Sequence, residues 1–385
     1  MIRSKIHRYK MTRTLLMSGL LMIGLLPNTA IKAFAAAGSF ALTGSLNTAR
    51  FGHTATLLPN GDVLVTGGLG VNGIYSPLAS AELFNPAKGK WTVTGSMSVG
   101  RAFFTATSLP NGEVLVTGGT GYTAYCFATA ELYNPSTGQW KTTGSMTQPR
   151  CYHTATLLPT GEVVVAGGAD SAVNTPNTMA SAELYNPSTG IWQTTGSLNV
   201  SRASQVALLE SGQAFVAGGY NTSNTTTTGL TSVELYEPST GKWTLTASMT
   251  ALFGPTTPVL LTNNDVLIAS EVEFYNPATA AWTSTGPLPI PKTAGPPSLA
   301  TLLNTGNVLA SGTRCTYSGC GGAATTICFL YAFSSNTWSV AGDMNQARLS
   351  HTSTLLPNGQ VLVAGGYAHV ASEPIVLSSA ELYTQ

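Results

Sequence analysis

Short apolar segments separated by turn residues run through the chain from about residue 40 to its end. In the first of them, residues 53–58 mix threonine with alanine and leucine, and the turn sequence Pro59-Asn60-Gly61 follows. The next apolar segment, residues 63–66, ends at Gly67-Gly68. Short apolar segments bounded by Gly, Pro and Asn are typical of β-strands joined by tight turns. The pattern therefore predicts an all-β fold made of many short strands.

The same pattern returns with a period of about 50 residues, which indicates a repeat architecture. Five copies end an apolar strand in a glycine pair and two carry degenerate pairs; the seven are Gly67-Gly68, Gly118-Gly119, Gly167-Gly168, Gly218-Gly219, Ala269-Ser270, Gly312-Thr313 and Gly365-Gly366. Most copies continue with a Glu-Leu-aromatic motif, and a tryptophan follows seven residues after the aromatic. The chain's six tryptophans all occupy this place: Trp91, Trp140, Trp192, Trp243, Trp282 and Trp338. We therefore predict seven units of four strands, a to d in chain order.

This combination of glycine pair, tyrosine and tryptophan resembles the kelch repeat over residues 38–385. The resemblance implies four-stranded blades arranged radially around a central channel. The last copy stops after Glu381-Leu382-Tyr383, whereas residues 40–46 match residues 91–97, where strand d of the first copy is expected. We therefore predict a single all-β domain, a seven-bladed kelch-type β-propeller whose ring is closed by the N-terminal strand completing the last blade.

Residues 1–37 differ in character from the rest of the chain. Basic residues, an apolar run over residues 15–26 and an alanine-rich sequence over residues 33–37 follow one another, in the order of a secretory signal peptide. The apolar run is shorter than the roughly 20 residues that a spanning helix needs, so an uncleaved membrane anchor is the less favoured alternative. We predict cleavage after Ala35 or Ala37 and a secreted mature protein, free or attached to the cell surface, without a membrane span.

Removal of this segment changes the charge balance. It holds six of the 17 Lys and Arg residues and none of the 16 Asp and Glu residues, so the mature chain has eleven basic and sixteen acidic side chains, a net charge of −5. A weakly acidic chain lacks the basic surface that nucleic acids require. We therefore expect no nucleic-acid partner.

In a kelch-like blade the b–c loops and the d–a connections lie on one face, called here the loop face. These loops vary in length and the fifth is almost absent, and variable loops on a rigid scaffold commonly carry function. The candidate binding residues on this face are Tyr75, Tyr122, Tyr125, Phe127, Tyr152, His153, Tyr317, Tyr367 and His369. We predict a monomeric binding scaffold that engages an extracellular protein or glycan through them. Two alternatives stay open: aromatic residues that only cover the blade ends, and a structural surface protein without a discrete ligand.

Residues 150–154, Arg-Cys-Tyr-His-Thr, support an enzymatic alternative. They resemble galactose oxidase, a copper radical enzyme with a seven-bladed kelch propeller, in a Tyr-His pair ahead of a Leu-Leu-Pro-x-Gly turn. The resemblance implies copper bound by Tyr152 and His153, and oxidation of carbohydrates or alcohols. However, the cysteine that this family cross-links to a tyrosine has no match, and the slot of His153 holds related residues in the other copies: His53, Phe104, Gln205 and His351. A residue position that recurs with the repeat favours a role in hydrogen bonding within the repeat. We therefore expect a binding protein rather than an enzyme, with no catalytic residue and no metal or cofactor.

Arginine opens the first strand of five copies, and glutamate recurs in the third strand of the same copies. The arginines are Arg50, Arg101, Arg150, Arg202 and Arg348, and the glutamates are Glu82, Glu131, Glu183, Glu234 and Glu381. Both positions are expected near the loop face. We therefore predict one charge-assisted pair in each of these blades.

The five cysteines also map to the loop face: Cys126, Cys151, Cys315, Cys320 and Cys328. Disulfides are expected in an exported protein, although their connectivity does not follow from sequence. Cys126 and Cys151 belong to neighbouring copies and are candidates to meet. We expect one bridge among the other three.

Overall fold

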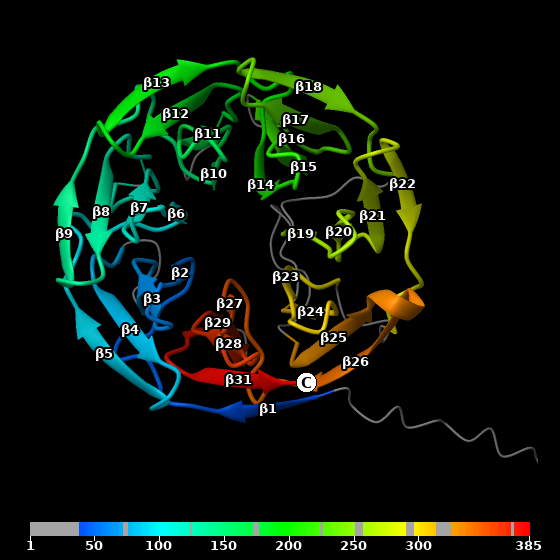
Figure 1. The fold of residues 1–385 in the computed structure, drawn as a ribbon. Helices are drawn as coiled ribbons and strands as arrows, with labels where there is room; N and C mark the ends of the chain where they lie inside the picture. The colour runs from blue at the N-terminus through cyan, green and yellow to red at the C-terminus, as the bar shows by residue number, and fades with distance from the viewer. Residues whose placement is uncertain are drawn as a thin grey trace, which may run out of the picture. The chain divides into compact units, whose positions relative to one another are not determined.

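The computed structural model describes residues 38–71, 76–123, 125–171, 177–223, 226–250, 257–289, 296–312, 325–370 and 373–385. Residues 1–37, with the predicted signal peptide, lie outside the described residues. Within the described part, seven antiparallel sheets surround a central channel, each with four strands in its main path (Figure 1). The helical content of this part is one 3₁₀ turn, η2 (Phe333–Ser335). The prediction of an all-β, seven-bladed propeller is confirmed.

In blades 1 to 6, strands a to d follow chain order from the channel outward, and in blade 7 the outermost strand d is the N-terminal β1. In blade order, strands a are β2 (Thr54–Leu57), β6 (Thr105–Ser108), β10 (Thr154–Leu157), β14 (Ala203–Leu208), β19 (Pro258–Leu260), β23 (Leu299–Leu302) and β27 (Thr352–Leu355). Strands b are β3 (Val63–Thr66), β7 (Val114–Thr117), β11 (Val163–Ala166), β15 (Ala214–Ser223), β20 (Val266–Ile268), β24 (Val308–Ser311) and β28 (Val361–Ala364). Strands c are β4 (Ala81–Asn85), β8 (Ala130–Asn134), β12 (Ala182–Asn186), β17 (Val233–Glu237), β21 (Glu273–Asn276), β25 (Ile327–Ala332) and β31 (Ala380–Thr384). Strands d are β5 (Lys90–Thr94), β9 (Gln139–Thr142), β13 (Ile191–Thr195), β18 (Lys242–Thr246), β22 (Ala281–Ser284), β26 (Thr337–Asp343) and β1 (Ser39–Leu42).

Strand b is buried on both of its faces, which explains its unbroken apolar sequence. Every residue of β3 is buried, and the same holds for β7, β11, β24 and β28. Strand d forms the rim, so most of its side chains are exposed. In β5, for example, Trp91 is buried whereas Val93 is exposed.

The hydrophobic core is divided among the interfaces between blades, because each cluster of buried apolar residues combines two neighbouring blades. Within blade 2, the Tyr133 and Trp140 rings pack with their centroids 5.0 Å apart. Both side chains also bond to blade 1: the Tyr133 hydroxyl lies 2.9 Å from Thr94 Oγ1, and Trp140 Nε1 donates to the Gly95 carbonyl at 2.8 Å. The repeated Tyr and Trp therefore join each blade to the one before it.

The ring closes through the N-terminal strand, as predicted. Strand β1 pairs antiparallel with β31, with Ser39 opposite Thr384 and Phe40 opposite Tyr383. The Phe40 and Tyr383 ring centroids are 5.0 Å apart. Phe40 thus stands where the other blades have tryptophan, and a core cluster shared by blades 7 and 1 completes the ring.

Within the described residues, two blades carry β-hairpins on the loop face. In blade 4, β15 continues beyond its glycine pair and pairs with β16 (Thr226–Gly229); in blade 7, β29 (Tyr367–Val370) pairs with β30 (Glu373–Val376). Blade 5 has only residues 269–272 between strands b and c, as the sequence predicted.

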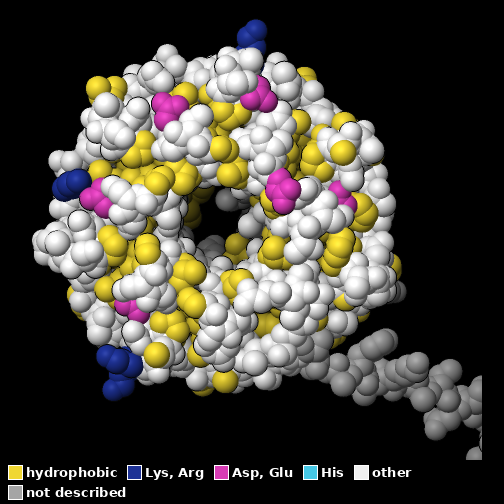
Figure 2. Space-filling view, in the orientation of Figure 1, with side chains coloured by type: hydrophobic (Ala, Val, Ile, Leu, Met, Phe, Trp, Pro, Cys, Tyr) yellow, Lys and Arg dark blue, Asp and Glu magenta, His cyan; other side chains and the backbone are white. Residues whose placement is uncertain are grey.

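Figure 2 shows the channel opening at the centre of one face of the ring, with acidic side chains spread over several blades. In the part of the chain that the structure describes, no helix has the length and apolar character needed to cross a bilayer.

Candidate functional site

Five buried ion pairs lie beneath the loop face. In blade 1, Arg50 Nη2 lies 2.9 Å from Glu82 Oε1, and Arg50 Nη1 donates to the carbonyls of Gly67 and Ser80 at 2.8 and 3.0 Å. Neither charged side chain is more than 1% exposed. The equivalent pairs are Arg101–Glu131, Arg150–Glu183, Arg202–Glu234 and Arg348–Glu381. The predicted contacts are confirmed.

The carboxylate of each pair also holds the connection that enters its blade. Glu82 accepts hydrogen bonds from the backbone N–H groups of Asn47 at 2.7 Å and Thr48 at 3.0 Å. Burial lowers the pKa of Arg50, and the Glu82 carboxylate partly offsets this effect. The guanidinium stays charged because its ordinary pKa lies far above neutral pH. Strands b and c and the d–a connection are therefore tied together at one buried point.

Histidine at the start of strand a bonds to the preceding blade. His153 Nε2 lies 3.0 Å from Thr105 Oγ1 and 3.1 Å from Thr117 Oγ1. A Cβ at residue 118 would lie 2.7 Å from His153 Cε1, so Gly118 provides the room for the ring. Burial, together with the Arg150 charge, lowers the pKa of His153 to about 3. The imidazole is therefore neutral at pH 7.

The other two histidines of this slot are held in the same way. His53 Nε2 lies 3.1 Å from Thr352 Oγ1 of blade 7, and His351 Nε2 lies 3.0 Å from Ser311 Oγ of blade 6. Burial is the main cause that lowers the pKa of His351 to about 3 and the pKa of His53 well below its usual value. These contacts give the recurring histidines a role within the repeat.

Four residues, each two positions after an arginine, form a hydrogen-bonded collar at the channel mouth. Ser350, Gly52, Phe103 and Tyr152 all have left-handed backbone, with φ of 49°, 60°, 55° and 54°. The N–H of Gly52 donates to Ser350 at 3.2 Å, that of Phe103 to Gly52 at 3.3 Å and that of Tyr152 to Phe103 at 3.0 Å, each time to the carbonyl. The Tyr152 ring stacks on Phe103 with centroids 4.6 Å apart. Left-handed backbone costs a residue other than glycine about 1–2 kcal/mol, so Phe103 and Tyr152 are strained.

Strand a of blade 4, β14, begins differently from strands a of blades 1 to 3. The sequence places Gln205 in the histidine slot of this blade, but the structure places Ser204 there, next to Gly219. Ser204 Oγ donates to the Ala217 carbonyl at 2.8 Å, and the strand register shifts between Ala203 and Gln205. A bulge changes which side chain faces inward. The prediction for Gln205 is therefore wrong.

A cavity of about 390 Å³ lies at the channel mouth beside the collar. Its wall includes Gly52, Phe103 and Tyr152 of the collar, His53 and His153, and the first residues of β2, β6 and β10. The described residues of this wall include no Asp, Glu, Lys or Arg. Its accessible surface is more polar than apolar, with the Phe103 and Tyr152 rings as the aromatic part. A concave site of a few hundred Å³ is of the size that binds small ligands or single side chains.

The residues around Tyr152 and His153 do not fit a copper centre. His153 Nε2 is engaged by two threonine hydroxyls, and the Tyr152 ring lies against Phe103. Among the residues that the structure describes, no three His, Cys, Asp or Glu side chains come close enough to hold a metal ion. A copper site needs several nitrogen, oxygen or sulfur ligands that converge. We therefore derive no oxidation step from this pair.

Exposed apolar side chains occur in the b–c loops of blades 1 and 2 and in the connection between these blades. In the b–c loop of blade 2, Tyr122 and Tyr125 are 68% and 71% exposed. Val71, in the loop of blade 1, is 72% exposed, and Val99, between the two blades, is 42% exposed. These four residues are called the apolar patch below. Two of them, Tyr122 and Tyr125, were predicted binding residues.

Other predicted binding residues are packed against the scaffold. The Phe127 ring centroid lies 5.4 Å from Arg101 Cζ, and the Tyr367 ring centroid lies 5.0 Å from that of Phe51. Burial raises the pKa of Tyr367. These two rings therefore support the loops that carry them. The predicted residues outside the described part are Tyr75, Tyr317 and the side chain of His369.

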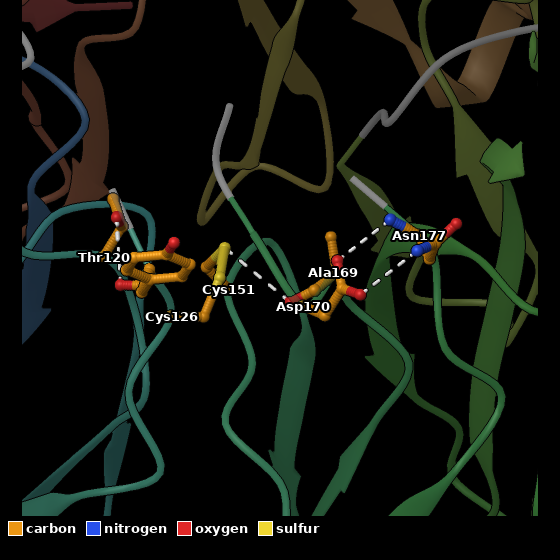
Figure 3. Close-up of a disulfide and its surroundings, with 7 residues drawn as sticks. Thr120, Cys126, Cys151, Ala169, Asp170 and Asn177 are labelled. Carbon is orange, nitrogen blue, oxygen red and sulfur yellow. Dashed lines mark hydrogen bonds between the residues drawn. A yellow bond between two sulfur atoms is a disulfide. The ribbon is translucent and has the colours of Figure 1, made fainter. Parts of the chain in front are cut away.

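A disulfide joins the loop of blade 2 to the entry of blade 3. Cys126, which belongs to the same loop as Tyr122 and Tyr125, is bonded to Cys151. Figure 3 shows this bond between the loop residue Thr120 and a turn of blade 3 that contains Asp170 and Asn177. The Asn177 N–H donates to Asp170 Oδ1 at 2.9 Å. The pairing of these two cysteines is confirmed.

The cysteines of blade 6 have different outcomes. Cys328, on β25, is a buried free thiol, and burial raises its pKa. Cys315 and Cys320 lie outside the described residues. The expectation of one bridge among the three therefore stays a prediction for Cys315 and Cys320.

Sequence reasoning missed Phe103 and the collar. The available signal was the repeat position two residues after the recurring arginine, which is occupied by Gly52, Phe103, Tyr152 and Ser350. Glycine in one copy is consistent with left-handed backbone in all of them. Only the structure shows that the aromatic side chains of this column stack beside a cavity.

Comparison with known proteins agrees with the architecture. The Kelch motif matches residues 211–250, from the a–b turn of blade 4 to just beyond its strand d. A search of curated proteins finds no match. Kelch propellers are a general type of protein-binding scaffold. The chain is therefore a seven-bladed β-propeller in which one blade matches the Kelch motif.

Proposed function

We propose that this protein is a secreted, monomeric scaffold that binds a protein partner on its loop face. The apolar patch carries the proposal. Val71, Val99, Tyr122 and Tyr125 expose apolar surface on neighbouring loops of one face. Apolar side chains gathered on one face are typical of interaction sites, and tyrosine is enriched among residues that dominate binding energy.

A disulfide and a buried ion pair restrain the loop that carries Tyr122 and Tyr125, which favours tight binding. The Cys126–Cys151 disulfide restrains the loop that presents Tyr122 and Tyr125. The buried Arg101–Glu131 pair lies beneath the same blade end. A loop that is already ordered loses less conformational entropy when a partner binds.

Charge on the loop face favours a protein partner over nucleic acid. The described lysines lie on c–d turns or on strands d: Lys88, Lys90, Lys141 and Lys242. The five described arginines near the loop face are buried in ion pairs. The described part of this face therefore presents no exposed cation to a phosphate backbone.

Export is supported by two separate features. The disulfide is of a kind that persists in oxidising compartments. Residues 1–37 have the order of charges and apolar residues of a signal peptide. N-terminal sequencing of the protein from the culture medium should begin near residue 36 or 38, whereas an intact Met1 on the cell pellet would contradict export.

Site-specific cross-linking tests the docking face. A photo-reactive phenylalanine analogue is placed at Tyr122, and in a control protein at Val93, which is 66% exposed on the outer strand β5. We expect a discrete cross-linked protein from Tyr122 only, and its loss when Tyr125 and Val71 are replaced by serine in the same protein. Cross-linking of equal strength and identity from both positions would contradict a loop-face site.

A further inference from the structure

Two strained aromatic residues border the channel cavity. Phe103 and Tyr152 hold φ of 55° and 54°, where the equivalent residue of blade 1 is Gly52. Glycine adopts this backbone without strain, so the collar hydrogen bonds alone do not require an aromatic residue. Strained backbone of this kind clusters at binding sites, where the rest of the fold holds it in place.

The residues that line the cavity favour an uncharged aromatic ring as its ligand. The stacked Phe103 and Tyr152 offer aromatic surface. The threonines that begin β2, β6 and β10 offer no free hydroxyl to a ligand, because two of the oxygens are buried and that of Thr105 bonds to Thr117 and His153. Both histidines of the wall are neutral at pH 7 because burial disfavours their charged form and lowers each pKa. Aromatic rings gain additional stabilisation from offset or edge-to-face contact with other aromatic rings. The described wall offers no oppositely charged side chain to a charged group.

The cavity and the apolar patch lie on the same blades. The cavity wall is built by blades 1 to 3 with Val206 of blade 4, and the patch lies on the loops of blades 1 and 2. A partner that covers the patch is therefore next to the channel mouth. Interfaces commonly obtain most of their affinity from an aromatic side chain inserted into a central pocket.

We propose that the protein partner inserts an uncharged aromatic side chain into this cavity, against Phe103 and Tyr152. The identity of the donor as a protein rests on the proposed function, whereas the preference of the cavity for an aromatic ring does not. The two statements are tested separately.

The first experiment measures binding of small probes by saturation-transfer NMR and calorimetry. The probes are N-acetyl-tyrosinamide and N-acetyl-phenylalaninamide, with N-acetyl-glutamate, glucose and galactose as comparisons. We expect the two aromatic amides to bind with a Kd of about 1 mM, an affinity that corresponds to a fragment, and the other three not to bind. Binding of the sugars without the amides would assign the cavity to a glycan and overturn the proposal.

Substitutions within the collar provide matched variants. Phe103→Gly and Tyr152→Gly remove the rings and also relieve left-handed strain, so we expect a Tm within about 3 °C of the parent and at least a roughly fivefold loss of amide affinity. Ser350→Gly is the control, since Ser350 has the same backbone, with φ of 49°, but is exposed and lies outside the cavity wall. Unchanged affinity in Phe103→Gly and Tyr152→Gly would overturn the role of the two rings.

Combined with cross-linking from Tyr122, the probes separate the two proposals. Amide binding without a cross-linked protein would keep the cavity and overturn the protein partner. A cross-linked protein without amide binding would keep the docking face and overturn the aromatic insertion. Competition between the amides and the cross-linked partner would support both.

Discussion

At the scale of single residues, Arg101 is the sharpest test of what the buried ion pairs contribute. Its Nη2 lies 2.8 Å from Glu131 Oε1, and its Nη1 donates to the carbonyls of Gly118 and Thr129. Removing one partner of a buried pair leaves the other charge uncompensated and costs about 3–5 kcal/mol. We therefore expect Arg101→Ala to lower the free energy of unfolding by this amount, as measured by urea titration.

Lys141→Ala is the matched control for that substitution. It also removes one cation from an ion pair, but Lys141 is 64% exposed and its Nζ lies 3.2 Å from Glu113 Oε1. Exposed pairs contribute about 0–1 kcal/mol. Losses of similar size in the two variants would show that the buried pairs do not hold the blades together.

The buried histidines predict a dependence of stability on pH. His153 and His351 have pKa values of about 3 in the folded chain, against an ordinary value of 6.5. Below pH 6.5 the unfolded chain therefore binds protons that the folded chain does not, and stability falls as the pH falls towards 3. Each histidine contributes a slope of about 1.4 kcal/mol per pH unit inside this window. Unfolding titrations from pH 6.5 to pH 4.5 measure the slope above the range where most carboxylates titrate.

His153→Phe separates this effect from other groups, since Phe104 already occupies the same slot in blade 2. The variant should lose one histidine's share of the slope. It should also lose about 1 kcal/mol at pH 7, because the Thr105 and Thr117 hydroxyls lose their bonds to His153 but keep the bond to each other. An unchanged slope would mean that His153 does not titrate as described.

At the scale of elements, strand β1 is the part whose contribution is easiest to isolate. Phe40 packs against Tyr383 at 5.0 Å between ring centroids and belongs to the rim of the core between blades 6 and 7. Leu42 lies on the same strand but is 61% exposed. We expect Phe40→Ala to cost about 2–3 kcal/mol, the range for a largely buried side chain, and Leu42→Ala less than about 0.5 kcal/mol. Thermal unfolding of both variants checks the contrast, and equal shifts would contradict a specific closing contact.

The elements that sequence could predict are those set by local chemistry. The glycine pair at residues 67–68, the turn at Pro59-Asn60-Gly61 and the place of Trp91 each specify a strand end, a turn or a core contact on their own. The bulge in β14 could not be predicted, because in the sequence Gln205 occupies the position that histidine has in other copies. The shift in register is seen only in the pairing of β14 with β15. The length of the b–c loops was visible in the sequence, whereas the exposure of Tyr125 and the packing of Phe127 depend on neighbouring loops.

At the scale of the whole molecule, the ring follows from the repeat but the channel mouth does not. Seven copies and a displaced strand d near Phe40 predict a closed ring without any structure. The cavity depends on how far apart the blades stand and on the backbone of Phe103 and Tyr152, which is set by hydrogen bonds between blades. The repeated position two residues after arginine marks where these bonds form, but it does not show that two of its side chains stack beside a cavity.

A circular permutant tests whether closure in blade 7 is equivalent to closure in any other blade. Ser39 lies opposite Thr384, so a short glycine linker from Gln385 to Gly38 would form an ordinary c–d turn. New termini between Ser239 and Thr240, both exposed in a c–d turn of blade 4, leave the loop face and the channel untouched. Because blade 4 is then closed by a terminal strand as blade 7 is now, we expect one unfolding transition and a Tm within about 5 °C of the parent. Tryptophan fluorescence during heating measures both quantities. Two separate transitions would mean that the ring has a preferred closing blade, and that β1 contributes more than one strand among seven.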